Sequence, residues 1–310
     1  MNVTQCRDST ALLQDGEALS QRLSTDGYLF IRGLIPREAI MEASSKLLNI
    51  ASKDNWLAVD SAVLQGIVSE DFDPSTVRDP SAQALKAMWC DETLHRLRSH
   101  ENIVKLFERI FKEPVLVHPN FFLRNFFAKD SPTDSHQDKI FVGGGDFCTM
   151  WVPLGDYSVA NGVLTVAAGS NHQGIRKAKF AGMGTLDDLS GTWVTHAFNA
   201  GDVLIFTNLT VHRSMPNLTN KLRQSFDARY QPARLSVVNS SLVPSADSGC
   251  ADWDGVYANW KSKADQFYWK KFDLKIDALE KNHYEADYPA AFERALNGDL
   301  SMRETLLRLI

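Results

Sequence analysis

The chain has 310 residues, 44% of them hydrophobic, and its 33 basic and 38 acidic residues give a formal net charge of −5. This balance leaves no electrostatic footprint for nucleic acid. No apolar run approaches the ~20 residues that a membrane helix needs. The length suits one domain with extensions. We therefore expect a globular protein that binds neither nucleic acid nor a membrane.

The cysteines indicate a reducing compartment. The four of them, Cys6, Cys90, Cys148 and Cys250, lie far apart in the sequence and form no C-x-x-C pair. This spacing fits neither a zinc knuckle nor a disulfide framework, and it predicts free thiols. The N-terminal residues also lack the basic and apolar regions of an export signal. We expect a cytoplasmic protein.

Residues 1–112 are expected to form a mainly helical region that packs on the domain after it. Apolar residues recur at helical spacing, and Pro36 marks one helix start. The predicted helices are residues 11–25, 37–53, 80–97 and 101–112, with a short strand at 27–34 and a polar loop or lid at 54–78. Met88 and Trp89 fall on an apolar helix face and are expected in the core.

Residues 113–235 carry a different pattern, of short β-rich runs parted by Gly, Pro and Asp. The predicted strands are 115–118, 121–127, 147–154, 162–166, 193–198, 203–206 and 225–230. Seven or eight short strands with turns between them suggest a jelly-roll barrel, whose interior would hold a ligand. The basic and Gly-rich insert at 173–191 is expected to be a mobile loop near the mouth of the barrel.

Residues 236–310 are predicted to be a helical C-terminal extension. Its aromatic residues recur roughly at helical spacing and are Trp253, Tyr257, Trp260, Phe267, Tyr268, Trp269 and Phe272. Lysines are interleaved with them, but nearby aspartates cancel that charge, so nucleic-acid binding is not indicated. We expect the aromatic side to pack on the barrel or to form a homodimer contact, or the extension to cover an active site.

A candidate metal site begins at His136 and Asp138. In a β-strand residues i and i+2 point to the same face, so the two side chains can bind one ion. His212 is the candidate third ligand. Two histidines and one carboxylate on one face of an octahedron leave three positions open, an arrangement that suits non-haem Fe(II) and O2.

Arg223 follows His212 by eleven residues, across a turn rich in Pro and Asn. This spacing predicts neighbouring antiparallel strands for the two residues. Arg223 and Ser225 would share one strand face, and the guanidinium there could bind a carboxylate through two parallel hydrogen bonds. A surface ion pair is the alternative.

Six linked motifs then recur in a known order. They are His136-x-Asp138, Trp151-Val152-Pro153-Leu154, Asn161-Gly162-Val163-Leu164, Gly169-Ser170-Asn171-His172, Gly201-Asp202-Val203-Leu204-Ile205-Phe206, and His212-x-Ser214-x-x-Asn217 with Arg223. In this order they resemble the motifs of phytanoyl-CoA dioxygenase-like enzymes, over roughly residues 110–235. Within that family, the chain looks closest to bacterial natural-product hydroxylases.

The resemblance implies a mainly β fold with flanking α-helices, a double-stranded β-helix of the jelly-roll or cupin-like kind. It also implies a dioxygenase that uses Fe(II), 2-oxoglutarate and O2, hydroxylates an unactivated C–H bond of a small organic molecule, and releases succinate and CO2. Fe(II) would be held by His136, Asp138 and His212. The residues implied for 2-oxoglutarate are Arg223, Ser214, Trp151 and Gln137, although Gln137 would point away from the ligands in a strand.

Asp138 disfavours halogenation, because halogenating relatives have a small residue at that position. Desaturation or ring closure with the same cofactors stays open. Arg124 and Arg229 are candidates to bind a substrate carboxylate, or each could pair with a protein carboxylate, since an unpaired arginine inside a barrel is expensive. An acyl-CoA substrate would need a basic surface at the mouth of the barrel. Arg176, Lys177 and Lys179 are the candidate residues, and they give this alternative only weak support.

Two other classes of function compete. A cupin-like metal-binding protein without catalysis would not need Arg223 beside a complete ligand triad. A zinc hydrolase could use two histidines and one carboxylate, but the sequence has no H-E-x-x-H motif to supply the added acid or base. The dependence of succinate release on 2-oxoglutarate would separate the oxygenase from both.

Overall fold

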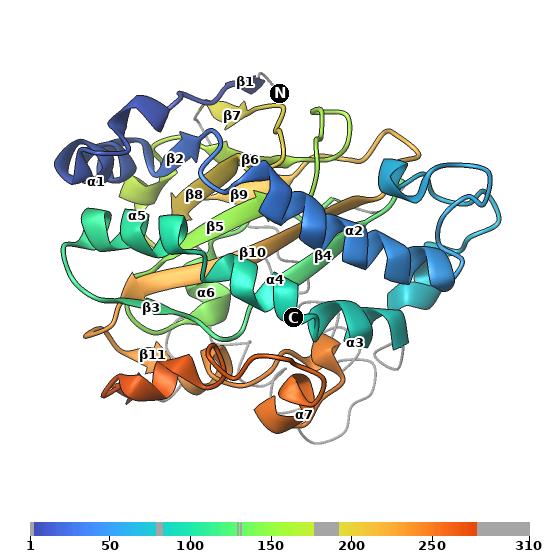
Figure 1. The fold of residues 1–310 in the computed structure, drawn as a ribbon. Coiled ribbons are helices and arrows are strands. Elements are labelled where there is room, and N and C mark those ends of the chain that lie inside the picture. The colour runs from blue at the N-terminus through green and yellow to red at the C-terminus, as the bar shows by residue number, and fades with distance from the viewer. Residues whose placement is uncertain (1–2, 79–82, 129, 131, 177–191, 278–310) are drawn as a thin grey trace, which may run out of the picture.

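The computed structural model describes residues 3–78, 83–128, 130, 132–176 and 192–277. Part of the insert predicted to be a mobile loop, including Lys177 and Lys179, lies outside these residues, as does the C-terminal tail from residue 278. The described part has two large β-sheets, with helices on one side, and a further pair of short strands (Figure 1).

The major sheet has six strands in the order β2-β8-β5-β10-β3, with β4 also paired to β10. Their bounds are β2 Tyr28–Ile31, β3 Val115–Val117, β4 Phe122–Phe126, β5 Cys148–Pro153, β8 Val203–Thr207 and β10 Arg223–Pro232. Strand β10 is the longest of these. It pairs antiparallel with β5 along one side, and with β4 and then β3 along the other.

The minor sheet has four strands in the order β1-β7-β6-β9. They are β1 Val3–Gln5, β6 Leu164–Ala167, β7 Trp193–Thr195 and β9 His212–Ser214. The jelly-roll prediction is confirmed by these two facing sheets. Strands β1 and β2 come from the region predicted to pack on the barrel as helices and one strand, so that region also contributes hydrogen-bonded strands to both sheets.

Alternation along the strands of the major sheet creates two cores. In β8, Val203 and Ile205 face the helices, whereas Leu204 and Phe206 face the minor sheet. Strand β10 alternates differently, because Phe226, Ala228 and Tyr230 face the helices while the opposite face carries the polar residues Arg223, Ser225, Asp227 and Arg229. This polar row on an otherwise apolar sheet marks the place where the two sheets do not pack together.

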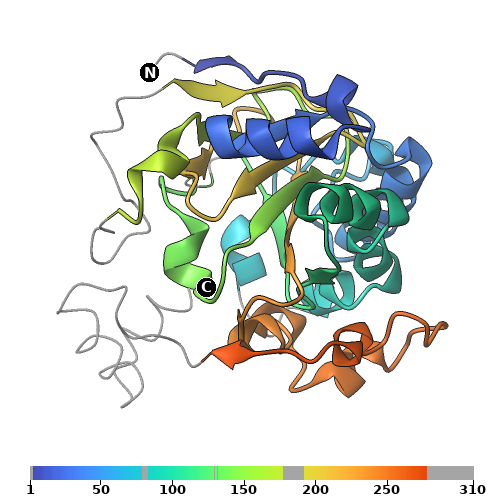
Figure 2. The same ribbon diagram turned by 90° about the vertical axis from the view of Figure 1, so that its left-hand side faces the viewer.

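The helices cover the outer face of the major sheet (Figure 2). They are α1 Gly16–Asp26, α2 Arg37–Lys53, α3 Gln83–Trp89, α4 Glu92–Arg98 and α5 Glu101–Phe111. Asp15 caps α1 by accepting a hydrogen bond from the Ala18 N–H, and Gly27 ends it with a left-handed φ of 78°. All four predicted helical regions are confirmed, the third being divided into α3 and α4. Met88 and Trp89 are buried in the core, as expected.

The segment 54–78 contains only two short 3₁₀ helices, Val63–Gln65 and Pro74–Arg78. It is otherwise irregular, as its polar composition predicts.

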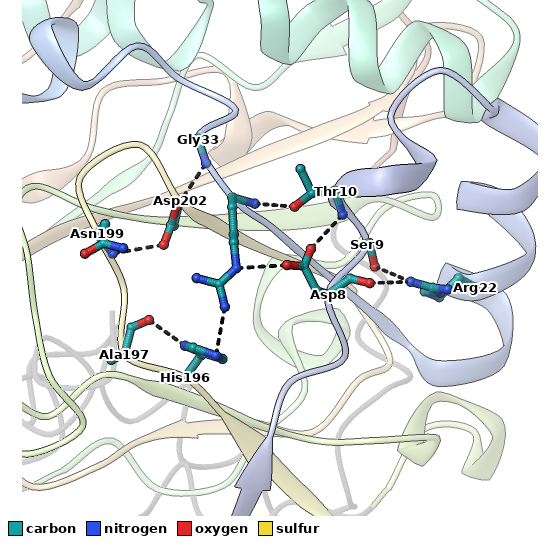
Figure 3. A network of polar contacts seen from close by, with 10 residues as sticks. Asp8, Ser9, Thr10, Arg22, Gly33, His196, Ala197, Asn199 and Asp202 are labelled. Carbon is teal, nitrogen blue, oxygen red and sulfur yellow. Dashed lines mark hydrogen bonds and ion pairs between the residues drawn. The ribbon is translucent and has the colours of Figure 1, made fainter.

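A polar network fastens the N-terminal segment to the rest of the fold (Figure 3). Arg32 donates to the Asp8 carboxylate over 2.8 Å, and its main-chain N–H donates to the Thr10 hydroxyl over 2.8 Å. Arg22 donates to the Asp8 carbonyl over 2.7 Å. The Arg32 guanidinium also contacts His196, which follows β7, over 3.1 Å. The network therefore links helix α1 to the segments that follow β1, β2 and β7, next to the β1 edge of the minor sheet.

The C-terminal prediction is wrong for the residues that can be described. Between 253 and 277 only α7, Trp253–Tyr257, is α-helical, and it is followed by a 3₁₀ turn, Tyr268–Lys271. Strand β12, Ile276–Asp277, pairs with β11, Val237–Val238. Aromatic spacing was a poor guide because these rings pack in several directions on each other instead of along one helix face.

The aromatic residues of this segment pack against α3 and α4 of their own chain. Trp253 lies 5.9 Å from Trp89 between ring centroids, and the Trp260 indole donates to the Cys90 carbonyl over 2.9 Å. Trp253 and Trp269 are buried. Among the described helices, none is long and apolar enough to cross a bilayer.

Candidate metal centre and co-substrate pocket

The candidate site is a cavity between the inner faces of the two sheets. It has roughly 430 Å³ of empty space, part of it open to solvent. The lining residues are Arg124, Thr133, His136, Asp138, Thr149, Trp151, Leu164, Phe206, His212, Ser214, Arg223, Asp227 and Arg229. All of the predicted site residues except Gln137 therefore reach one cavity.

The three candidate metal ligands converge inside this cavity. His136 and His212 exchange both main-chain hydrogen bonds, each over 3.0 Å, which places their side chains next to each other. The Asp138 Oδ1 atom lies 3.8 Å from Nε2 of His136 and 3.6 Å from Nε2 of His212. One ligand atom from each residue lies within 4.8 Å of the other two, and all three residues are buried.

The local backbone differs from the predicted strand. His136 and Gln137 are extended, but helix α6, Asp138–Val142, begins at the third position. The prediction that His136 and Asp138 share the face of one strand is therefore wrong, although the two side chains do meet. The candidate metal-binding carboxylate sits on the first residue of a short helix.

Main-chain carbonyls orient both imidazoles. His136 donates from Nδ1–H to the Asp134 carbonyl over 2.7 Å, and His212 donates from Nδ1–H to the Thr210 carbonyl over 3.0 Å. Because a carbonyl oxygen can only accept, these bonds fix the orientation of each ring, and both Nε2 atoms face the Asp138 carboxylate. Burial, and then the neighbouring His212, lower the pKa of His136 to about 3, so it is neutral at pH 7.

Asp138 is ionised. Burial by itself would raise the pKa of this carboxyl group, but Arg229, the two histidines and a hydrogen bond from the Thr149 hydroxyl lower it to about 2. Two imidazole nitrogens and one carboxylate oxygen, already close together inside the cavity, fit a divalent first-row metal ion with open coordination positions.

Arg223 lies in the same cavity but in the other sheet. The predicted pairing of the His212 and Arg223 strands is wrong, because β9 pairs with β6 in the minor sheet and β10 belongs to the major sheet. The Pro- and Asn-rich segment between them crosses from one sheet to the other. The ligand triad and Arg223 therefore face each other across the barrel interior.

The surroundings of Arg223 leave its guanidinium available to bind an anion. Arg223 is only 3% exposed, and in the described part of the chain no carboxylate lies within ion-pair distance of it. Its guanidinium carbon lies 4.5 Å from the centroid of the Phe126 ring and 5.9 Å from that of Trp151. Burial lowers the pKa of Arg223 to about 10, which leaves it protonated at pH 7.

Ser225 orients this arginine, although the sequence did not indicate that role. Its hydroxyl oxygen accepts from Arg223 over 2.8 Å and from the Trp151 indole over 3.0 Å. The prediction that Arg223 and Ser225 share one face is confirmed. Trp151 is thereby held at the wall of the cavity, where the resemblance placed it.

The other two predicted 2-oxoglutarate residues differ in position. Ser214 lines the cavity, and its hydroxyl accepts from the Thr133 N–H over 2.7 Å. The Gln137 amide points away from the ligands, as expected for an extended segment. It donates to the carbonyls of Gly174 and Leu209 over 2.9 and 2.6 Å. Gln137 thus fixes the loop after residue 173 rather than lining the pocket.

The two predicted substrate arginines also face carboxylates. Arg124 donates from Nε to Asp227 over 2.9 Å. Arg229 has its Nε 3.8 Å from Oδ2 of Asp138. The sequence analysis missed Thr149 and Asp227. Alternation along the strand would have found Asp227, which is four residues after Arg223 and on the same face, whereas nothing in the spacing relates Thr149 to Asp138.

The family model of phytanoyl-CoA dioxygenase (PhyH) matches residues 23–225, about two thirds of the chain. The chain belongs to the PhyH family. This assignment confirms the resemblance read from the six motifs. As a PhyH-family protein with a His-Asp-His site, the chain is an oxygenase that depends on iron and 2-oxoglutarate.

Curated PhyH-family relatives cover most of the chain. A protein named 1-deoxypentalenic acid 11-beta-hydroxylase from Streptomyces arenae is 28% identical over 267 residues, which are 78% of this chain and 90% of the relative. The protein of the same name from Streptomyces exfoliatus is 29% identical over 269 residues, with the same coverage.

Solved structures share the fold of this PhyH-family chain. The epimerase SnoN, solved with Fe3+, alpha ketoglutarate and nogalamycin RO, superposes with a TM-score of 0.55 at 20% identity, covering 72% of this chain and 86% of SnoN. The non-heme monooxygenase ThoJ gives a TM-score of 0.52 at 22% identity, covering 71% and 79%. At these identities the likeness establishes the fold alone.

Proposed function

We propose that the chain hydroxylates an unactivated C–H bond of a small organic acid, with a secondary metabolite as the expected class of substrate. One observation carries the proposal. One cavity contains the His136, Asp138 and His212 triad and the buried Arg223. A further arginine, Arg124, also lines it. The relatives named as hydroxylases of 1-deoxypentalenic acid, itself an acid, support the same choice.

The charges of the lining residues favour an anion. Arg124, Arg223 and Arg229 carry three positive charges, and Asp138 and Asp227 carry two negative charges. The lining therefore has a net charge of about +1, which a divalent metal ion would raise to about +3 and 2-oxoglutarate would return to about +1. A substrate with a single carboxylate would neutralise the remainder, and Arg124 is the residue that we propose to contact it.

Each group in the cavity then has a role. His136, Asp138 and His212 hold the iron through Nε2, Oδ1 and Nε2. Arg223, with Ser214 in the lining of the same cavity, would bind the distal carboxylate of 2-oxoglutarate, and Trp151 would form one side of that pocket. When bound, iron with 2-oxoglutarate and O2 supplies the oxidising power for C–H cleavage. Leu164 and Phe206 exclude water from the wall nearest the ligands.

A substrate screen tests the proposal. The purified protein, with Fe(II) and 2-oxoglutarate, is incubated with small terpenoid and polyketide acids and with their methyl esters, and succinate and the oxidised product are measured. We expect acids, but not esters, to stimulate succinate release and to gain one oxygen atom. The variant Arg124→Gln should raise KM for the acid at least about tenfold without changing KM for 2-oxoglutarate.

Other outcomes would redirect the assignment. A product that has lost two hydrogen atoms would indicate desaturation or ring closure. Stimulation only by acyl-CoA esters would favour that substrate class, for which Arg176 is the described basic residue. The absence of succinate from every mixture, with iron bound, would refute the oxygenase and favour a cupin-like binding protein or a zinc hydrolase.

Two further expectations concern the whole chain. A cytoplasmic location is supported by the four cysteines, all of them free. A homodimer through the aromatic C-terminal segment stays a prediction. Trp253, Tyr257 and Trp269 are buried within one chain, so a dimer contact would have to use the exposed residues of that segment.

A further inference from the structure

The two oxygen atoms of Asp138 have different surroundings. Oδ1 faces the Nε2 atoms of His136 and His212, at 3.8 and 3.6 Å. Oδ2 faces away from them, accepts a hydrogen bond from the Thr149 hydroxyl, and lies 3.8 Å from Nε of Arg229. The carboxylate is therefore oriented before any metal ion is bound.

Thr149 and Arg229 reach Oδ2 as a matched pair. They are directly opposite each other on the antiparallel strands β5 and β10, so their side chains leave the sheet on the same face. Thr149 is 1% exposed. Because an ionised carboxylate can only accept, the threonine hydroxyl must donate to Asp138. Thr149 lies outside the His136-x-Asp138 motif, so the motif alone does not predict this hydrogen bond.

Arg229 contributes charge and restricts space. It is 5% exposed, its Nε has no hydrogen-bond partner, and its guanidinium carbon lies 4.6 Å from the centroid of the Phe122 ring. Among the described residues, the carboxylate within ion-pair distance of Arg229 is that of Asp138. The phenyl ring holds the guanidinium beside Oδ2, where it balances the negative charge of the carboxylate.

The consequence concerns how many positions Asp138 occupies on the metal. A carboxylate can bind through one oxygen or through both, and two histidines with a one-oxygen carboxylate leave three of six positions open. A carboxylate that bound through both oxygens would leave two. We propose that Thr149 and Arg229 are positioning residues that hold Oδ2 of Asp138 away from the metal, so that Asp138 binds through Oδ1 alone and three positions stay available. This inference rests on the metal site in the proposed function.

The test measures metal binding instead of turnover. Thr149→Val keeps the shape of the side chain and removes the hydroxyl, Thr149→Ser keeps the hydroxyl, and Thr165→Val is a matched control. Thr165 is also buried, but its hydroxyl donates to the Val194 carbonyl over 2.9 Å, outside the cavity lining. Co(II) is titrated anaerobically into each metal-free protein, and the visible Co(II) spectrum reports its coordination.

Loss of a group that orients a metal ligand usually costs 10- to 100-fold in affinity. We therefore expect Thr149→Val to bind Co(II) at least about tenfold more weakly than the wild type, with an altered spectrum. Thr149→Ser should stay within about threefold of the wild type, and Thr165→Val should be unchanged. Urea unfolding of each metal-free protein checks the fold, and Thr149→Ala replaces Thr149→Val if the latter does not fold.

Arg229→Met gives a second measurement, in which the affinity for Co(II) should not fall. Removing a positive charge should leave Co(II) binding at least as tight, because a nearby cation repels the ion. Freeing Oδ2 should let Asp138 occupy a second position, so we expect the Co(II) form to bind 2-oxoglutarate about tenfold more weakly. A role confined to stabilising the fold would change neither this affinity nor the spectrum.

The outcomes separate the two levels of the argument. If the wild type binds no Co(II), the metal site itself fails and the inference fails with it. If the wild type binds Co(II) and Thr149→Val and Arg229→Met match its affinities and spectrum, the inference is refuted while the proposed function stands.

Discussion

Replacing Arg223 with methionine should make the metal-free protein more stable while it disables co-substrate binding. Arg223 is buried, and among the described residues it has no carboxylate within ion-pair distance. A buried charge without a partner is costly, and an apolar side chain of similar volume removes that cost. The substitution Arg223→Met therefore separates what the fold needs from what the pocket needs.

The magnitude follows from the burial. The pKa of Arg223 falls from 12.5 to about 10 because of burial, and a difference of that size corresponds to about 3 kcal/mol. Methionine forfeits the hydrogen bond to Ser225, about 1 kcal/mol, and the contacts with two aromatic rings, about 1 kcal/mol. We expect the free energy of unfolding of the metal-free protein to rise by about 1 kcal/mol.

Binding should change in the opposite direction. Truncating one partner of a buried charge pair costs about 2–5 kcal/mol, so the affinity of the Co(II) form for 2-oxoglutarate should fall by at least about thirtyfold. Urea unfolding and calorimetric titration measure the two effects. Arg96→Met is the matched control, because Arg96 is 63% exposed and its ion pair with Asp265 should contribute little. A variant that is destabilised by more than about 1 kcal/mol and binds 2-oxoglutarate normally would refute the reasoning.

Three further predictions use groups outside the pocket chemistry. Burial lowers the pKa of His118 from 6.5 to about 3, so the unfolded chain takes up a proton that the folded chain does not, and folding loses about 2 kcal/mol of stability between pH 7 and pH 5. His118→Gln should lose that much less over the same interval in urea unfolding, and parallel pH profiles would contradict this. Gly16→Ala should destabilise the protein by about 1–3 kcal/mol, because the added methyl group would collide with the Arg109 carbonyl on α5. This loss should exceed the gain from the higher helix propensity of alanine, and an increase in the unfolding midpoint would contradict the prediction. Burial raises the pKa of three of the four thiols, Cys6, Cys90 and Cys148, to about 12, so a thiol reagent at pH 7.5 should react rapidly with at most one cysteine in the native protein and with all four in urea.

The sequence predicted what depends on alternation within one strand. Arg223 and Ser225 share a face because they are two residues apart, and the same rule extends to Asp227 and Arg229. The ligand residues and Arg223 were also identified correctly as neighbours of one cavity, since six ordered motifs carry that information. Periodicity and motif order thus gave the inner face of β10 and the composition of the cavity.

What the sequence could not predict depends on contacts between distant segments. The Thr149 hydroxyl on β5 meets Asp138 at the start of helix α6 only in the folded chain. The sequence between β9 and β10 is typical of a hairpin turn. Only the pairing of β9 with β6 shows that this segment connects two different sheets. The extended conformation before Asp138 ended one residue earlier than expected because the chain there begins a helix.

The inner face of β10 also determines how this enzyme can be altered. Arg223 stands at the end of the strand proposed to bind the co-substrate, and Arg229 stands beside the candidate metal ligand Asp138, six positions along one uninterrupted strand. Substituting one inward residue leaves the others in place. Inserting or deleting a single residue in β10 would turn every later side chain to the opposite face, placing Tyr230 or Ala228 toward the candidate metal ligands and an arginine against the helices. Directed evolution of the substrate range should therefore use substitutions in β10 and confine changes of length to the connecting loops.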